Sequence, residues 1–86
     1  MRINTQFQPM ENEDNALEEK ARQIADKIKM LRKAKGFTSH ETFAFTHELN
    51  RVQYWRVEKG ENITLKTLLR ILAIHNLSLE EFFKGL

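Results

Sequence analysis

The stretch of sequence that decides the fold covers residues 36–60 and reads GFTSHETFAFTHELNRVQYWRVEKG. Either Thr38 or Ser39 can cap a short helix at its start, because each hydroxyl can accept a hydrogen bond from a first-turn backbone N–H. Asn50 can cap a second short helix, which Gly60 then ends. The connection between the two helices is too short for a helical hairpin with a roomy loop. We therefore expect them to cross at a steep angle.

A longer helix is predicted ahead of this stretch. Its apolar residues recur at spacings of four, three, four and three, the pattern of one buried helix face: Leu17, Ala21, Ile24, Ile28 and Leu31. Asn15, with Glu18 three residues later, can begin this helix, and Gly36 can end it.

Two further helices are predicted after it. Thr64 can open a helix that Asn76 ends in a left-handed conformation. The residues expected to point inward from this helix are Leu65, Leu68, Leu69 and Leu72. Ser78 and Glu81 have the spacing of a capping box for a short fifth helix. No hairpin turn joins two alternating runs, so the pattern predicts a compact all-α fold of five helices.

Length and composition predict one folded domain. The chain has 86 residues, of which 41% are hydrophobic and 30% charged, and no Cys, which excludes disulfides and thiolate metal sites. No apolar run is long enough for a membrane span or a signal peptide, so we expect a cytoplasmic protein with no membrane contact. Residues 1–15 predict an N-terminal arm, either flexible or docked through Ile3 and Phe7, and residues 16–86 predict the domain.

The positive charge is concentrated near the end of the first predicted helix. Residues 16–36 carry seven basic and three acidic groups, a net charge of +4, whereas the whole chain carries +2. Lys33 and Lys35 lie at the basic end of this segment. Two interpretations stay open: an electrostatic footprint for DNA, or a lysine-rich helix end that complements its own dipole.

The helix predicted over residues 51–59 has two different faces. Tyr54 and Val57, three residues apart, are the natural inward pair. The residues left facing outward are Arg51, Val52, Gln53, Trp55 and Arg56. Long donor side chains interleaved with apolar ones suit a DNA groove, which offers acceptors and thymine methyl groups. A merely solvated face would be richer in Glu and Lys.

Several runs resemble the Cro and phage-repressor family of helix-turn-helix proteins: IKMLRKAKGF at 28–37, SHETFA at 39–44, RVEKG at 56–60 and LSLEEF at 77–82. The resemblance covers roughly residues 17–84. It implies a lambda-repressor-like DNA-binding domain of five helices with an N-terminal arm. In this family the second and third helices form the DNA-binding unit, the third helix lies in the major groove, and dimers bind paired half-sites.

The resemblance also implies roles for individual residues. Those at base-reading positions are Arg51, Val52 and Arg56. Those at DNA-backbone positions are His40, Gln53, Asn62 and Thr64. The charge distribution adds Lys33 and Lys35 as residues expected at the DNA backbone. The sequence departs from the family at His40, where Gln is usual, and at Thr38, which lengthens the preceding loop by one residue. The loop after Gly60 is one residue shorter, and we expect Glu61 to point away from a phosphate.

Arg32 and Glu58 match a charged pair that the family uses inside its fold to join the first helix to the end of the third. A charge-assisted hydrogen bond would hold the recognition helix in place. The alternative is two separate surface charges.

Enzyme activity has no support in the sequence. His40 with Glu41, and His47 with Glu48, each begin like the zinc-protease helix motif, but Ala44 and Arg51 stand where its second His is needed. His47 is therefore interpreted as a half-buried packing residue. We expect no metal, no cofactor and no catalysis.

These observations predict a sequence-specific double-stranded-DNA-binding regulator of transcription, a repressor that acts as a homodimer. Phe82, Phe83 and Leu86 cannot all be buried in so small a domain, so some of them are expected in the dimer contact. One alternative is an antitoxin-type protein that also binds a toxin partner through residues 1–15. Another is a protein-interaction module that does not bind DNA. For Trp55 the open roles are flanking a phosphate, touching a base, packing on Phe37 and the second helix, or stacking on single-stranded bases.

Overall fold

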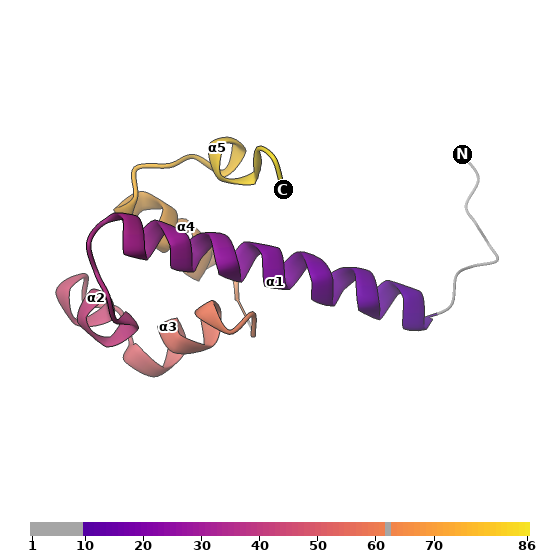
Figure 1. Cartoon of the computed structure of the whole chain (residues 1–86), viewed down its shortest axis with the longest axis horizontal. Helices are drawn as coiled ribbons and strands as arrows, with labels where there is room; N and C mark the ends of the chain where they lie inside the picture. The colour runs from indigo at the N-terminus through magenta and orange to yellow at the C-terminus, as the bar shows by residue number, and fades with distance from the viewer. Residues whose placement is uncertain (1–9, 62) are drawn as a thin grey trace.

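The computed structural model describes residues 10–61 and 63–86, and all regular structure in those ranges is helical (Figure 1). The five helices are α1 (Met10–Ala34), α2 (His40–Thr46), α3 (Arg51–Glu58), α4 (Leu65–Ile74) and α5 (Leu79–Phe83). The predicted all-α class and the predicted number of helices are confirmed. Among the described helices, none combines the length and the apolar character that crossing a membrane requires.

Side-chain caps begin the helices where the sequence predicts them. Ser39, not Thr38, caps α2, and its hydroxyl accepts a hydrogen bond from the Thr42 N–H at 3.1 Å. The Asn50 side chain accepts from the Gln53 N–H at 2.8 Å and begins α3. Thr64 caps α4 in the same way, and Ser78 and Glu81 form the predicted capping box of α5. The short helices of the domain are therefore started by local polar contacts.

The first helix begins earlier than predicted. The start expected near Asn15 is wrong, because α1 already begins at Met10. Its added first turns consist mostly of residues with good helix propensity. These turns project beyond the other helices (Figure 1). Leu17, predicted to be buried, is therefore 68% exposed. Residues 1–9 lie outside the described residues, and the division into an arm and a domain stays a prediction.

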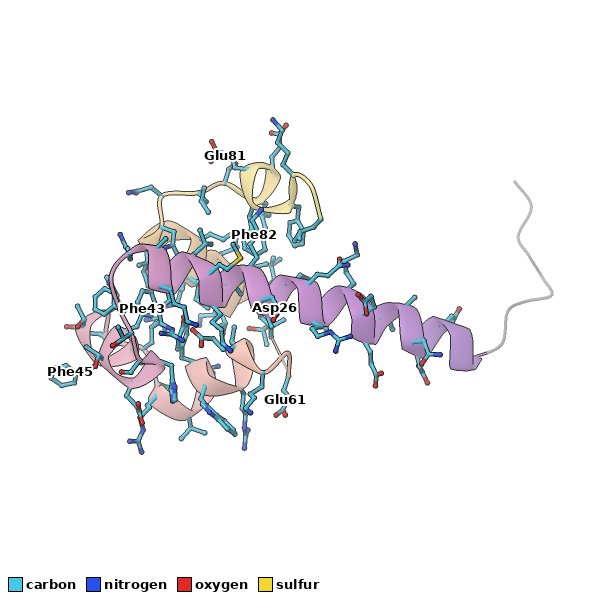
Figure 2. The ribbon with its side chains drawn as sticks, viewed as in Figure 1. Asp26, Phe43, Phe45, Glu61, Glu81 and Phe82 are labelled. Atoms are coloured by element: carbon cyan, nitrogen blue, oxygen red, sulfur yellow. The ribbon has the colours of Figure 1, made fainter. Side chains whose placement is uncertain are left out.

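The core lies where all five helices meet, and Phe43 of α2 stands at its centre. The centroid of its ring lies 5.1 Å from that of the Tyr54 ring, 5.2 Å from that of the Phe37 ring and 4.6 Å from that of the His47 ring. Figure 2 shows Phe43 turned inward and Phe45 of the same helix turned outward. The other helices contribute fully buried side chains to this core, among them Ile28, Val57, Ile71, Leu72 and Phe82. The prediction that His47 is a packing residue is confirmed.

Two of the inward positions predicted on α4 are wrong. Leu65 is 62% exposed and Leu69 is 44% exposed, whereas Leu68, Ile71 and Leu72 are buried. Leu65 is the first residue of α4. Leu69 is rotated by about 100° from Leu68 around the helix axis, which turns it away from the core. The apolar surface of α4 is thus wider than the face that the core covers.

The tight turn between α2 and α3 depends on an unusual backbone conformation. Glu48 has a φ of 58°, in the left-handed region. This lets the Leu49 N–H donate to the Ala44 carbonyl at 2.8 Å and ends α2 sharply. The conformation costs an ordinary L-residue about 1–2 kcal/mol, because its Cβ crowds the following carbonyl. The tight connection between α2 and α3 is therefore achieved at some expense in stability. The steep crossing of the two helices stays a prediction.

Replacing Glu48 by Gly is expected to raise the free energy of unfolding by about 0.5–1 kcal/mol, since glycine has no Cβ to crowd the turn. Urea denaturation followed by circular dichroism would measure the change. Glu41→Gly is the matched control, because it alters the same residue type inside α2 and should lower stability by up to about 1 kcal/mol. A loss of stability in Glu48→Gly would show that the turn is not strained.

Candidate nucleic-acid interface

Helix α3 divides its side chains between the core and the surface. Tyr54 and Val57 are each only 1% exposed, and the capped start of α3 at Asn50 fixes which residues face inward. The side chains left on the surface are the five predicted from spacing: Arg51, Val52, Gln53, Trp55 and Arg56. An eight-residue helix therefore presents a mixed basic, amide and apolar face to solvent.

The surface is hollowed on both sides of Val52. A shallow hollow of about 410 Å³ lies between Val52, Gln53 and Arg56 and the cap residue Asn50. A second hollow, of about 430 Å³, is lined by Val52, Arg51 and Trp55 of α3 and by His40 and Glu41 of α2. The residues assigned to base reading thus lie together, and His40 of the preceding helix lies beside them. Their role in reading bases stays a prediction.

The residues assigned to the DNA backbone fall into separate groups. The Gln53 side-chain amide donates to the Thr67 hydroxyl at 3.4 Å, and the Thr64 hydroxyl donates to the same oxygen at 3.1 Å. Gln53 and Thr64 are therefore brought together at the start of α4. Asn62 lies outside the described residues.

Lys33 and Lys35 do not line the hollows around α3. Lys33 is on the last turn of α1, Lys35 follows that helix, and both are exposed. The positive charge of Lys35 acts instead on His75 at the end of α4. Burial, Lys35 and His47 together lower the pKa of the His75 imidazole. Counting charge along the sequence therefore found a basic segment but did not locate it relative to α3.

A third hollow, of about 250 Å³, was missed by the sequence reasoning. Its walls are exposed Lys29 of α1, half-buried His40 of α2, exposed Trp55 of α3, and exposed Lys59, which caps the end of α3. The only available signal was the spacing of four residues between Arg51, Trp55 and Lys59, which places them along one side of the helix. Lys29 comes from a distant part of the chain.

The floor of this third hollow is the pair that joins α1 to α3. Arg32 Nε lies 2.7 Å from Glu58 Oε2, and Arg32 Nη2 lies 3.0 Å from Glu58 Oε1. The third nitrogen, Nη1, donates to the Phe37 carbonyl at 2.9 Å. The two side chains are only 5% and 6% exposed. The alternative of two separate surface charges is wrong, because one guanidinium ties together α1, α3 and the segment before α2.

Both members of this pair are charged. The hydrogen bond to Glu58 raises the pKa of Arg32 against the opposing effect of burial. Burial alone would raise the pKa of the Glu58 carboxyl, but the hydrogen bonds and charge of Arg32 outweigh it and leave that pKa below its usual value. Burial and the nearby Glu58 carboxylate raise the pKa of the Tyr54 phenol far above its ordinary range. At neutral pH the pair therefore consists of a carboxylate and a guanidinium.

The pair α2 and α3, joined by the tight turn at Glu48 and with the buried face of α3 against the core and its polar face outside, defines a helix-turn-helix protein. The control protein C.MunI of a Mycoplasma species is 36% identical to this chain over 64 residues, which make up 73% of this chain and 86% of C.MunI. No family model and no solved structure matches the chain. The chain belongs to the control-protein family of helix-turn-helix regulators.

Replacing Glu58 by Gln is expected to lower the free energy of unfolding by about 3 kcal/mol at neutral pH, because it leaves the buried Arg32 guanidinium without a counter-charge. Since folding lowers the pKa of Glu58, its stabilisation is present above its unfolded pKa of 4.5 and is lost as the pH falls below that value. Urea denaturation at a series of pH values would measure both effects.

The matched control is Glu61→Gln, which removes an exposed carboxylate just after α3 and should change stability by less than about 0.5 kcal/mol. Equal stability of Glu58→Gln and Glu61→Gln would show that the buried pair does not hold the fold together.

Proposed function

We propose that this protein regulates transcription by binding specific double-stranded DNA sequences with α3 in the major groove. The observation that carries the proposal is the division of α3, which buries Tyr54 and Val57 and leaves Arg51, Val52 and Arg56 exposed beside two hollows. Membership of the control-protein family supports a regulatory role.

The exposed side chains suit the chemistry of the major groove. A guanidinium can donate two parallel hydrogen bonds to O6 and N7 of guanine, and a valine can pack on the methyl group of thymine. Within the described residues, neither Arg51 nor Arg56 takes part in an ion pair, so both guanidiniums are available. Arg51, Val52 and Arg56 would read bases, and His40, Gln53 and Thr64 would contact the adjacent phosphates. Lys33, Lys35 and Asn62 remain further candidates for backbone contacts.

A homodimer is the proposed binding form. Phe82 closes the core, whereas Phe83 and Leu79 of α5 and Leu65 and Leu69 of α4 are exposed, each pair four residues apart on one helix face. Exposed apolar side chains of this kind suit a two-fold contact between copies. A dimer would place two copies of α3 in successive major grooves about 34 Å apart. Repression would follow because a duplex covered by the dimer is closed to other proteins.

An antitoxin-type protein remains the second candidate. It would keep the same DNA-binding unit and use residues 1–15 for a toxin partner. The observation that favours it is the start of α1, which projects beyond the other helices (Figure 1), together with the exposure of Leu17 on that helix. Co-purification of one defined toxin with the full chain, lost on Leu17→Glu, would support this candidate over a regulator without a protein partner.

Arg56→Ala is expected to weaken binding to a duplex selected from a random pool by about 5- to 150-fold, the equivalent of one base contact worth about 1–3 kcal/mol. Binding to random duplex should change far less, because phosphate contacts are unaffected. Fluorescence anisotropy with both duplexes measures the two affinities. Arg22→Ala, on an exposed part of α1, is the control. An equal loss on both duplexes would refute a base-reading role for Arg56.

Leu69→Glu is expected to shift the protein from dimer to monomer, because it places a charge in the apolar surface of α4. Sedimentation equilibrium would report the mass, and binding to a duplex with two half-sites should weaken more than binding to one half-site. Leu17→Glu changes an exposed leucine on the projecting part of α1 and should leave the mass unchanged. An unaltered mass for Leu69→Glu would remove α4 from the proposed contact.

A further inference from the structure

The third hollow, called the cleft below, lies over the Arg32–Glu58 pair and contains lysines that form no ion pair within the described residues. Its exposed walls include the ammonium groups of Lys29 and Lys59. The ion pairs within the described residues join Arg22 to Glu19 and Arg32 to Glu58, so no carboxylate neutralises either lysine there. The Glu58 carboxylate below them is already paired through both oxygens. An anion entering the cleft would therefore meet two free cations and no free carboxylate.

The aromatic residues of the cleft hold its donors in place. Lys59 Nζ lies 4.9 Å from the centroid of the Trp55 ring, a cation–π contact that limits where the ammonium can go. The His40 ring lies 6.5 Å from the same indole and adds a ring N–H donor from α2. Trp55, 41% exposed, thus forms a wall between donors from two helices. This arrangement accounts for an exposed tryptophan that neither the core nor base reading requires.

The cleft continues the surface that is proposed to face DNA. It shares His40 and Trp55 with the hollow beside Arg51 and Val52. Arg51 and Trp55 of α3 and its C-cap Lys59 follow one another at intervals of four residues, so one side of the helix leads from the base-reading residues into the cleft. The sugar-phosphate backbone borders the major groove on both sides. A duplex seated on α3 would bring a backbone close to this end of the helix.

We propose that the cleft formed by Lys29, His40, Trp55 and Lys59 is a phosphate-binding site, and that its occupant is one phosphate of the DNA backbone at the edge of the groove read by α3. The inference rests on the proposed function and adds the site that sets where the backbone crosses the end of α3. Ammonium groups suit this role because they act as point charges, whereas base recognition favours planar, bidentate groups.

The first test compares Lys29→Gln and Lys59→Gln with Lys20→Gln, a control on the exposed N-terminal half of α1. Each cleft variant should bind selected and random duplexes about tenfold more weakly, as expected for one charged hydrogen bond. The double variant Lys29→Gln/Lys59→Gln should also reduce the slope of log affinity against log salt by about 0.9, because one phosphate then loses its neutralising cations. Lys59→Arg should retain the slope, because it keeps the charge. An unchanged slope in the double variant would overturn the proposal.

The second test locates the phosphate. Single phosphates of the selected duplex are replaced in turn by neutral methylphosphonates. At one position per half-site the replacement should weaken binding of the wild-type protein about tenfold. It should cost the double variant Lys29→Gln/Lys59→Gln little further, because both changes remove the same ammonium contacts. If every methylphosphonate weakened the wild-type protein and the double variant by the same factor, the assignment would be overturned. Urea denaturation of each variant verifies that it is folded.

The third test separates a DNA phosphate from a free one. Trp55 is the single tryptophan of the chain, so its fluorescence reports on the cleft directly. Adding the selected duplex should change the emission of Trp55. Adding millimolar inorganic phosphate should leave the emission the same as adding chloride at equal ionic strength. A saturable response to inorganic phosphate alone would overturn the DNA assignment. If the protein selects a specific duplex but the Lys29 and Lys59 variants bind it as tightly as the wild type, only the phosphate site in the cleft is refuted. If the protein binds no duplex at all, the proposed function is refuted as well.

Discussion

The geometry of the exposed surface depends on one buried ion pair. The Arg32 guanidinium of α1 donates hydrogen bonds to both carboxylate oxygens of Glu58 at the end of α3 and to the carbonyl of Phe37 before α2. An isolated helix of eight residues is not stable in water, so α3 exists only because neighbouring elements hold it. Tyr54 and Val57 fix its rotation, and Glu58 fixes its far end. The direction in which Arg51 and Arg56 project follows from these inward contacts.

Local signals in the sequence predicted most of the fold. The caps at Asn50, Thr64 and Ser78 could be recognised because each is a contact between residues three apart. Periodicity identified the inward face of α3 for the same reason. It was less successful at Leu17 and Leu69, because periodicity states which residues share a face but not how far the covering helices extend. The early start of α1 shows the same limit.

The candidate site was predictable to the extent that it lies on one element. The outward residues of α3 follow from its inward pair, and the Arg32–Glu58 pair followed from the resemblance to a known family. The cleft at the end of α3 could not be derived, because Lys29, His40 and Lys59 are brought together by three helices and their packing. The basic segment around Lys33 and Lys35 was visible in the sequence, but its position relative to α3 depends on tertiary structure.

The core and the exposed face of α3 share a helix but no side chain. Substitutions at Arg51, Val52 or Arg56 alter groups that pack against nothing in the interior, and changes at such surface positions usually shift stability by less than about 0.5 kcal/mol. Tyr54, Val57 and Glu58, in contrast, tolerate little change. Related proteins could therefore diverge in the nucleotide sequence they prefer while keeping the same scaffold, and natural variation along this helix would fall mainly on its outer positions.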